Sequence, residues 1–207
     1  LNRQQFEAHA RQRLAFQDIF LLLPGDYKIL YLLKNKTARD FTSYEMTLSV
    51  PAESSAPLLS PLLLYHGFSP ARDNLFKAFT FDGHEFLISA RNEFSPAEKL
   101  SVYARLGKKL VPTADLAVKL SLKNMDSSSE SYYERKFGRE IINDKGEIWC
   151  EPLELSQFKP GYYQLEVSLL EGDRLKATQK DNLIILSGAA LTAPWVYARV
   201  HQPPPST

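Results

Sequence analysis

Residues suited to metal or acid–base chemistry are scattered along this sequence. The histidines are His9, His66, His84 and His201, and no two of them have the His-x-x-x-His spacing that puts two imidazoles on one zinc ion. The segment Asp82-Gly83-His84-Glu85 gathers several such side chains, but Asp-Gly is also the dipeptide of a tight hairpin turn, which explains its polarity without a metal. We therefore predict no metal site and no cofactor.

Nucleophilic catalysis has no motif either, since the sequence lacks a Gly-x-Ser-x-Gly elbow. The single cysteine, Cys150, follows Trp149, and because free cysteines are among the most often buried residues we expect an inert core thiol. A pair of acids for glycoside hydrolysis is defined in space and not in sequence, so Glu147, Glu151 and Glu154 stay open as candidates. The motifs together predict that the chain is not an enzyme.

The elements that would position any site are strands. Leu116, Val118, Leu120 and Leu122 alternate with small or polar residues, which is typical of a strand with one apolar face. Residues 6–16 alternate similarly, although their Ala, Arg and Gln content leaves a helix as an alternative. Further strands are expected at 27–33, 45–50, 80–81, 85–89, 100–106, 132–142, 147–153, 165–169 and 183–186. Short strands between turn residues, without a helical apolar stripe, predict an all-β fold.

One local pattern occurs twice. Pro24-Gly25-Asp26-Tyr27 and Pro160-Gly161-Tyr162-Tyr163 are each preceded by leucines and followed by an alternating strand. Pro followed by Gly favours a type II turn, with Gly at positive φ. In immunoglobulin-like domains a Tyr at such a corner donates its hydroxyl to the backbone a few residues upstream. We therefore assign Pro24, Gly25, Tyr27, Pro160, Gly161 and Tyr163 structural roles, and predict tandem immunoglobulin-like (fibronectin III-like) antiparallel β-sandwiches.

The repeat suggests a division of the chain. Residues 1–68 are expected to form a first β-sandwich that is incomplete at its N-terminus, because the sequence starts inside a strand. Residues 69–190 are expected to form a second β-sandwich, and residues 191–207 an aromatic and proline-rich tail. The boundary is placed at residues 65–75, where His66 to Pro70 interrupts the pattern, although residues 51–57 also have the composition of a linker.

Composition limits the partners. The 25 basic and 24 acidic residues are dispersed, whereas a nucleic-acid-binding surface concentrates Lys and Arg. The most apolar stretch, residues 19–24, is much shorter than the roughly 20 residues that cross a bilayer. We therefore expect no nucleic-acid partner and no membrane span in this chain.

The order of motifs resembles a known family. The motifs are Leu23 to Tyr27, Leu48 to Pro51, Leu59 to Leu62, Phe79 to Gly83, Phe94 to Pro96, Leu100 to Tyr103, Leu155-Ser156, Pro160 to Tyr163 and Pro194 to Val196. They resemble the Ig-like C-terminal region of bacterial von Willebrand factor A-related and GWxTD-type envelope proteins. The resemblance implies an exported binding or scaffold region without enzymatic activity, located in the periplasm, at the cell surface or outside the cell.

Exposed aromatic residues are the candidates for contact with a partner. If residues 132–142 form a strand, one of Tyr132 and Tyr133 points outward, and Trp195 and Tyr197 lie beyond the last strand. Each also has a structural explanation, as a cross-strand aromatic or as a tail folded on its own domain. We predict a structural or protein-interaction module in a larger extracytoplasmic complex. The alternative is a carbohydrate-binding accessory domain with Trp149, Trp195 and surface tyrosines as stacking platforms.

Overall fold

The structure is a computed structural model that describes residues 19–36, 39–52, 55–71, 78–81, 83–88, 91–108, 110, 115–126 and 132–188. Its strands are β1 (Gly25–Asn35), β2 (Asp40–Val50), β3 (Leu63–Pro70), β4 (Thr80–Phe81), β5 (His84–Ile88), β6 (Glu93–Phe94), β7 (Lys99–Arg105), β8 (Leu116–Asn124), β9 (Tyr132–Phe137), β10 (Glu147–Glu154), β11 (Gly161–Glu171) and β12 (Arg174–Ile185). The helical turns η2 (Arg139–Ile141) and η3 (Leu155–Gln157) are short. The described residues include no helix long and apolar enough to cross a membrane. The prediction of an all-β fold is confirmed.

The chain divides into two compact units. Phe20–Pro57 is the smaller, and its strands β1 and β2 form an antiparallel two-stranded sheet, in register from Gly25↔Val50 to Asn35↔Asp40. We call it the hairpin unit. The larger unit comprises residues before Phe20 and after Pro57, and all its described strands lie in the part after Pro57.

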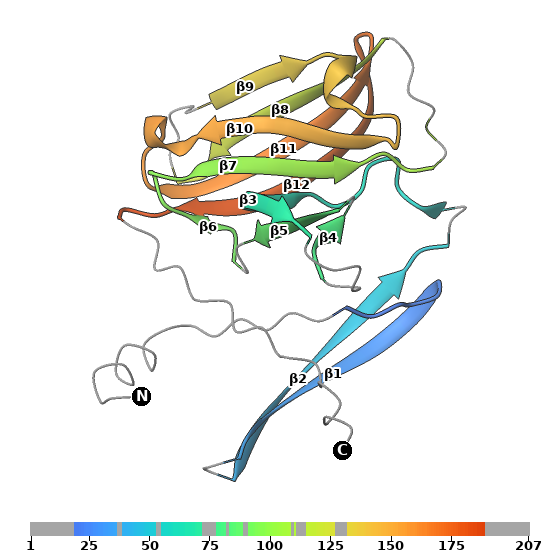
Figure 1. Cartoon of the computed structure of the whole chain (residues 1–207), viewed down its shortest axis with the longest axis vertical. Helices are drawn as coiled ribbons and strands as arrows, with labels where there is room; N and C mark the ends of the chain where they lie inside the picture. Colours follow the sequence, from blue (N-terminus) through green and yellow to red (C-terminus); the bar gives the residue numbers. More distant parts are fainter. Residues whose placement is uncertain are drawn as a thin grey trace, which may run out of the picture. The chain divides into compact units, whose positions relative to one another are not determined.

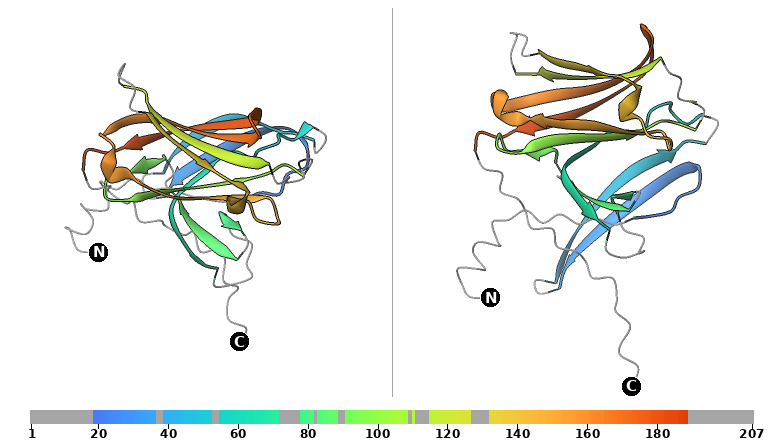
Figure 2. Two further views of the ribbon diagram at one scale, coloured as in Figure 1. Left: turned by 90° about the horizontal axis from the view of Figure 1, so that it is seen from above. Right: turned by 45° about the horizontal axis from the view of Figure 1, so that its top comes forward.

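The larger unit is a sandwich of two five-stranded sheets. One sheet has the order β10-β7-β3-β5-β4 and the other β6-β12-β11-β8-β9. The strands pair antiparallel, apart from the short parallel contact between β6 and β12. Figures 1 and 2 show the sheets as two layers.

The core lies between these layers. Alternate residues of β8 and β11 point into it, among them Leu120, Leu122, Leu165 and Leu169, all at most 1% exposed. The opposite sheet supplies Val102 and others from β7, β3 and β10. The period-two pattern therefore identified the buried face of these strands correctly.

Both corner tyrosines behave as predicted. The hydroxyl of Tyr27 donates to the Leu23 carbonyl over 2.7 Å, and the hydroxyl of Tyr163 to the Lys159 carbonyl over 2.8 Å, each four residues upstream. Gly25 and Gly161 have φ of +155° and +153°. Both values are positive, as expected, but far from the roughly +80° of a type II turn, because each glycine already begins its strand.

The structure divides the chain at residues 57 and 58, whereas the sequence led us to expect a boundary at residues 65–75. His66 to Pro70 lies inside β3, which pairs with β5 and β7 of the larger unit. The pattern breaks there because of a β-bulge: Tyr65 pairs with Ile88 and Gly67 with Leu87, which leaves His66 as the extra residue. Residues 63–68 therefore belong to the larger unit and not to the hairpin unit.

Residues 132–142 differ from the expected single strand. β9 ends at Phe137, and η2 follows after Gly138. β9 pairs with β8 and β10 pairs with β7, so the chain changes sheets between them. The turn at Asn143 to Gly146 is closed by one bridge, Ile142↔Ile148, and not by a long hairpin. Sequence alternation cannot reveal this crossover, because both sheets face the same core.

Candidate interaction surface

The surface that stands out lies on the hairpin unit. Leu30, Tyr31, Leu32 and Leu33 are consecutive in β1 and are 64%, 47%, 62% and 57% exposed. Because successive strand residues point to opposite faces, this run exposes apolar side chains on both faces of the sheet. Exposed contiguous apolar surface of this kind marks interaction sites in soluble proteins.

The second strand adds to the same surface. Phe41 and Tyr44 of β2 are both exposed, and the ring of Tyr44 lies 6.4 Å from that of Tyr31 opposite it. On the other face Lys28 and Glu45 form an ion pair of 2.9 Å. The pair is exposed and contributes at most about 1 kcal/mol. We call the exposed residues Leu30, Tyr31, Leu32, Leu33, Phe41 and Tyr44 the hairpin surface.

The hairpin surface was not predicted from the sequence, although the sequence contains a signal for it. Ile29 to Leu33 is an uninterrupted apolar run inside an otherwise alternating strand. Such a run is typical of a strand that is covered on both faces. In the described residues β1 has one neighbouring strand, β2, and the run is left exposed.

An aromatic cluster covers the outer face of the sheet β10-β7-β3-β5-β4. Tyr65, Phe86 and Tyr103 are buried there, and Trp149 is half-buried against them. The indole stacks on Phe86 at 5.4 Å and meets Tyr103 edge to face at 5.2 Å. Phe68 is 53% exposed and lies 5.8 Å from the same indole. The neighbouring rings therefore cover part of Trp149 and leave part of it exposed.

The aromatic residues named as interaction candidates are only partly described. Tyr133 is half-buried and its ring meets Phe158 edge to face at 5.9 Å, and Phe158 in turn contacts Tyr163. Tyr133 therefore packs toward the second corner. Tyr132 lies opposite Lys123 at the start of β9. Trp195 and Tyr197 lie outside the described residues, as does the proposed strand at residues 6–16.

The three acids considered for catalysis each have a different partner. Glu147 is buried and its carboxylate accepts hydrogen bonds from Asn143 Nδ2 at 2.7 Å and from the Tyr103 hydroxyl at 3.2 Å. Glu151 pairs with Arg135 at 2.5 Å, and Glu154 with Lys99 at 2.6 Å.

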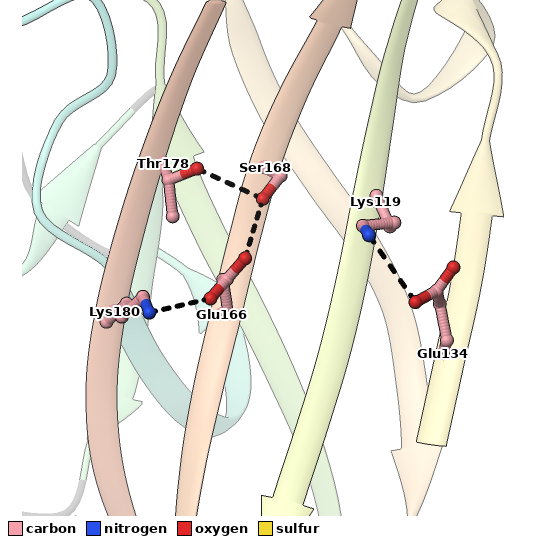
Figure 3. A network of polar contacts seen from close by, with 6 residues as sticks. All are labelled: Lys119, Glu134, Glu166, Ser168, Thr178 and Lys180. Atoms are coloured by element: carbon pink, nitrogen blue, oxygen red, sulfur yellow. Dashed lines mark hydrogen bonds and ion pairs between the residues drawn. The ribbon is translucent and has the colours of Figure 1, made fainter. Parts of the chain in front are cut away.

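Polar side chains cover the outer face of the other sheet (Figure 3). Glu166 of β11 accepts from Lys180 of β12 at 3.0 Å and from the Ser168 hydroxyl at 3.0 Å, and that hydroxyl lies 3.1 Å from Thr178 Oγ1. The hydrogen bond from Lys180 is the main reason why the pKa of Glu166 is lowered. Lys119 and Glu134 form a further ion pair of 3.4 Å between β8 and β9. This face is thus charged and well suited to contact with water.

His66, the bulged residue of β3, is the described histidine with the clearest electrostatic environment. Its ring packs on Phe94 at 4.5 Å, and Nδ1 lies 3.2 Å from Glu98 Oε1 without hydrogen-bond geometry. Burial lowers the pKa of His66, and the Glu98 carboxylate opposes that effect only in part. The imidazole is therefore held in its neutral form.

This environment predicts a pH effect on stability. Since the folded-state pKa of His66 lies below the unfolded value of about 6.5, its contribution to stability is complete above that value and is lost as pH falls through the folded pKa. We expect the free energy of unfolding to drop between pH 7 and pH 5 in urea titrations, and to drop less in His66→Gln. Equal pH dependence in both proteins would contradict this explanation.

The structure also describes Cys150 and the segment around His84, both of which were considered in the sequence. Cys150 is buried, unpaired, and has its pKa raised to about 12 by that burial, which confirms the expected core position. His84 contacts the rings of Phe68 and Trp149 edge to face. The Asp-Gly hairpin is also confirmed, because β4 pairs with β5 and Gly83 has φ of +77°. Among the described residues, no group of three or more His, Cys, Asp and Glu side chains is placed to hold a metal ion.

Comparison with known proteins gives no relative from which a role can be taken. No protein-family model and no curated protein sequence matches this chain.

Proposed function

We propose that this chain is a structural or protein-interaction module without enzymatic activity, and that the hairpin surface is where it contacts another protein. The observation that carries the proposal is the exposed run Leu30 to Leu33. Because each of the four side chains is about half exposed, a partner that covered one of them would gain roughly half of the 1.5–3 kcal/mol of a full burial. A partner chain would recover that free energy.

The contrast with the sandwich supports this assignment. The sandwich has a filled core, and its edge strands carry features that discourage pairing with other chains: Glu134, Arg135 and Lys136 on β9, and Pro152 beside a bulge on β10. β1 carries neither proline nor a bulge between Gly25 and Asn35, and its centre is uncharged. Strands β9 and β10 therefore carry protection against strand addition that β1 lacks.

We propose further that the two units are related immunoglobulin-like, fibronectin III-like domains. The support is the identical corner geometry, since the Tyr27 and Tyr163 hydroxyls both reach the carbonyl four residues upstream. In this proposal β1 and β2 are two strands of a first sandwich in which β1 is an edge strand, and the remaining strands come from outside the described residues. The location in an extracytoplasmic, bacterial envelope assembly rests on the family resemblance of the motifs.

A photo-crosslinking experiment tests the proposed function. Benzoylphenylalanine is placed at Leu32 of the hairpin surface or at Leu175 of β12, which are 62% and 58% exposed and so are a matched pair. In cells that naturally contain the protein, the Leu32 position is expected to crosslink to a second polypeptide, another copy of the chain included, at least about tenfold more than the Leu175 position, as expected for a specific contact. Equal crosslinking at both positions, or none at Leu32, would contradict the proposal.

A further inference from the structure

The exposed run in β1 distinguishes between two kinds of partner. A partner packed on one face of the hairpin would cover Tyr31 and Leu33 or else Leu30 and Leu32, but not both sets. A strand added beside β1 places side chains next to β1 on both faces at once. Among the described residues β1 pairs with β2 alone, so the strand would pair with the other edge of β1.

A two-stranded sheet also needs an addition. An isolated hairpin is marginally stable at best in water, and three or more strands are needed for independent stability. Strand addition supplies backbone hydrogen bonds in the same step, because the outward N–H and C=O groups of β1 gain partners.

β1 is complementary to itself. If two β1 strands pair antiparallel over their full length, Leu30 faces Leu30 of the second copy, since it is the central residue of Gly25–Asn35. Asp26 then faces Lys34 of the second copy, and two-fold symmetry makes this pairing occur twice. Neither Asp26 nor Lys34 forms an ion pair within the described residues. On the other face, Ile29 lies opposite Tyr31 of the second copy, and Tyr27 lies opposite Leu33.

Pairings of β1 with β1 that are shifted by two residues are less favourable. A shift by two residues in one direction puts Lys28 opposite Lys34 of the second copy, and like charges directly opposite destabilise a strand pair. A shift in the other direction puts Pro24, which has no N–H, opposite Lys34. The register with the longest overlap is therefore also the one with complementary charge.

The edge of β2 is not complementary to itself. Its full-length self-pairing would place Glu45 opposite Glu45 of the second copy. We propose that the chain forms a symmetric homodimer in which two β1 strands pair antiparallel about Leu30, giving a four-stranded sheet of order β2-β1-β1-β2. The inference rests on the proposed function, because it names a second copy as the partner of the hairpin surface.

Cysteine trapping tests the register. Leu30→Cys brings two thiols face to face at a Cα separation of about 4.5–5.5 Å, which a disulfide spans, whereas Leu32→Cys does not because Leu32 faces Lys28 of the second copy. The two leucines are equally exposed, and the native Cys150 is buried. Mild oxidation of the full chain should give a disulfide-linked dimer with Leu30→Cys and little with Leu32→Cys. Similar yields from both, or none from either, would overturn the register.

Charge reversal tests the dimer independently. Asp26→Lys places Lys opposite Lys at two symmetric positions, and we expect the dimer dissociation constant from sedimentation velocity to rise about tenfold. The double variant Asp26→Lys/Lys34→Asp should restore the dissociation constant of the parent protein. If the parent chain and both variants were all monomeric at 100 µM, the homodimer would be overturned. The proposed function would survive that result if Leu32 crosslinks to a different protein, and an intramolecular strand on this edge would give a monomer without any crosslink.

Discussion

Replacing Gly161 with alanine is expected to lower the free energy of unfolding by about 3 kcal/mol. Gly161 has φ of +153°, and the strain of such a backbone on a residue with a Cβ is of order 1–3 kcal/mol. The new Cβ would lie 2.8 Å from Asp126 Oδ2, which accepts a hydrogen bond of 2.6 Å from the Tyr162 N–H. Displacing that carboxylate adds about 1 kcal/mol. Urea denaturation followed by circular dichroism measures the change.

Gly172→Ala is the matched control for this prediction. Gly172 also has a positive φ, +59°, but no atom lies within 4 Å of a Cβ built there. A cost of only about 1 kcal/mol is expected, from backbone strain alone. If both variants lost the same stability, the contact between Asp126 and the corner would not be the reason for glycine at position 161.

Replacing Asn143 with alanine should also cost about 3 kcal/mol, because Asn143 organises the turn before β10. Its Oδ1 accepts hydrogen bonds from the Lys145 and Glu147 N–H groups, at 3.0 and 2.9 Å, and its Nδ2 donates to the Glu147 carboxylate. Each such bond contributes about 1 kcal/mol, and a buried carboxylate oxygen without its donor costs more. Chemical denaturation at pH 7 measures the loss.

Asn182→Ala provides the comparison. Asn182 is exposed, and substitutions at such surface positions usually stay within about 0.5 kcal/mol of the parent protein. The double variant Asn143→Ala/Glu147→Gln should recover part of the loss, because a neutral amide tolerates burial better than a carboxylate. Equal stability of Asn143→Ala and Asn182→Ala would show that the turn does not depend on these bonds.

Sequence reasoning identified the parts of the fold that depend on local chemistry. The alternation of β8 revealed its buried face, and Pro-Gly-x-Tyr revealed both corners, because period and turn residues act within a few positions. The bulge at His66 was taken for a boundary, since a local break in alternation has the same appearance in either case. The change of sheet between β9 and β10 depends on tertiary pairing that no local pattern encodes.

The candidate surface was found from the structure rather than from the sequence. Tyr133 was expected to make contacts but packs on Phe158, whereas the hairpin surface combines three leucines of β1 with Tyr31, Phe41 and Tyr44, none of which had been named as a contact residue. The apolar run at Leu30 to Leu33 was visible in the sequence. Its meaning depends on exposure, because the same run in a covered strand would belong to a core.

Hydrogen exchange of β1 tests most directly the claim that its outer edge binds a second copy. The full chain is compared at 1 µM and 100 µM, with peptides from β11 as the reference, because β11 lies between two strands of the sandwich at either concentration. We predict that exchange in residues 25–35 slows by about tenfold or more at the higher concentration, as expected when association stabilises a marginal element, while β11 is unchanged. Identical exchange of β1 at both concentrations would contradict the account.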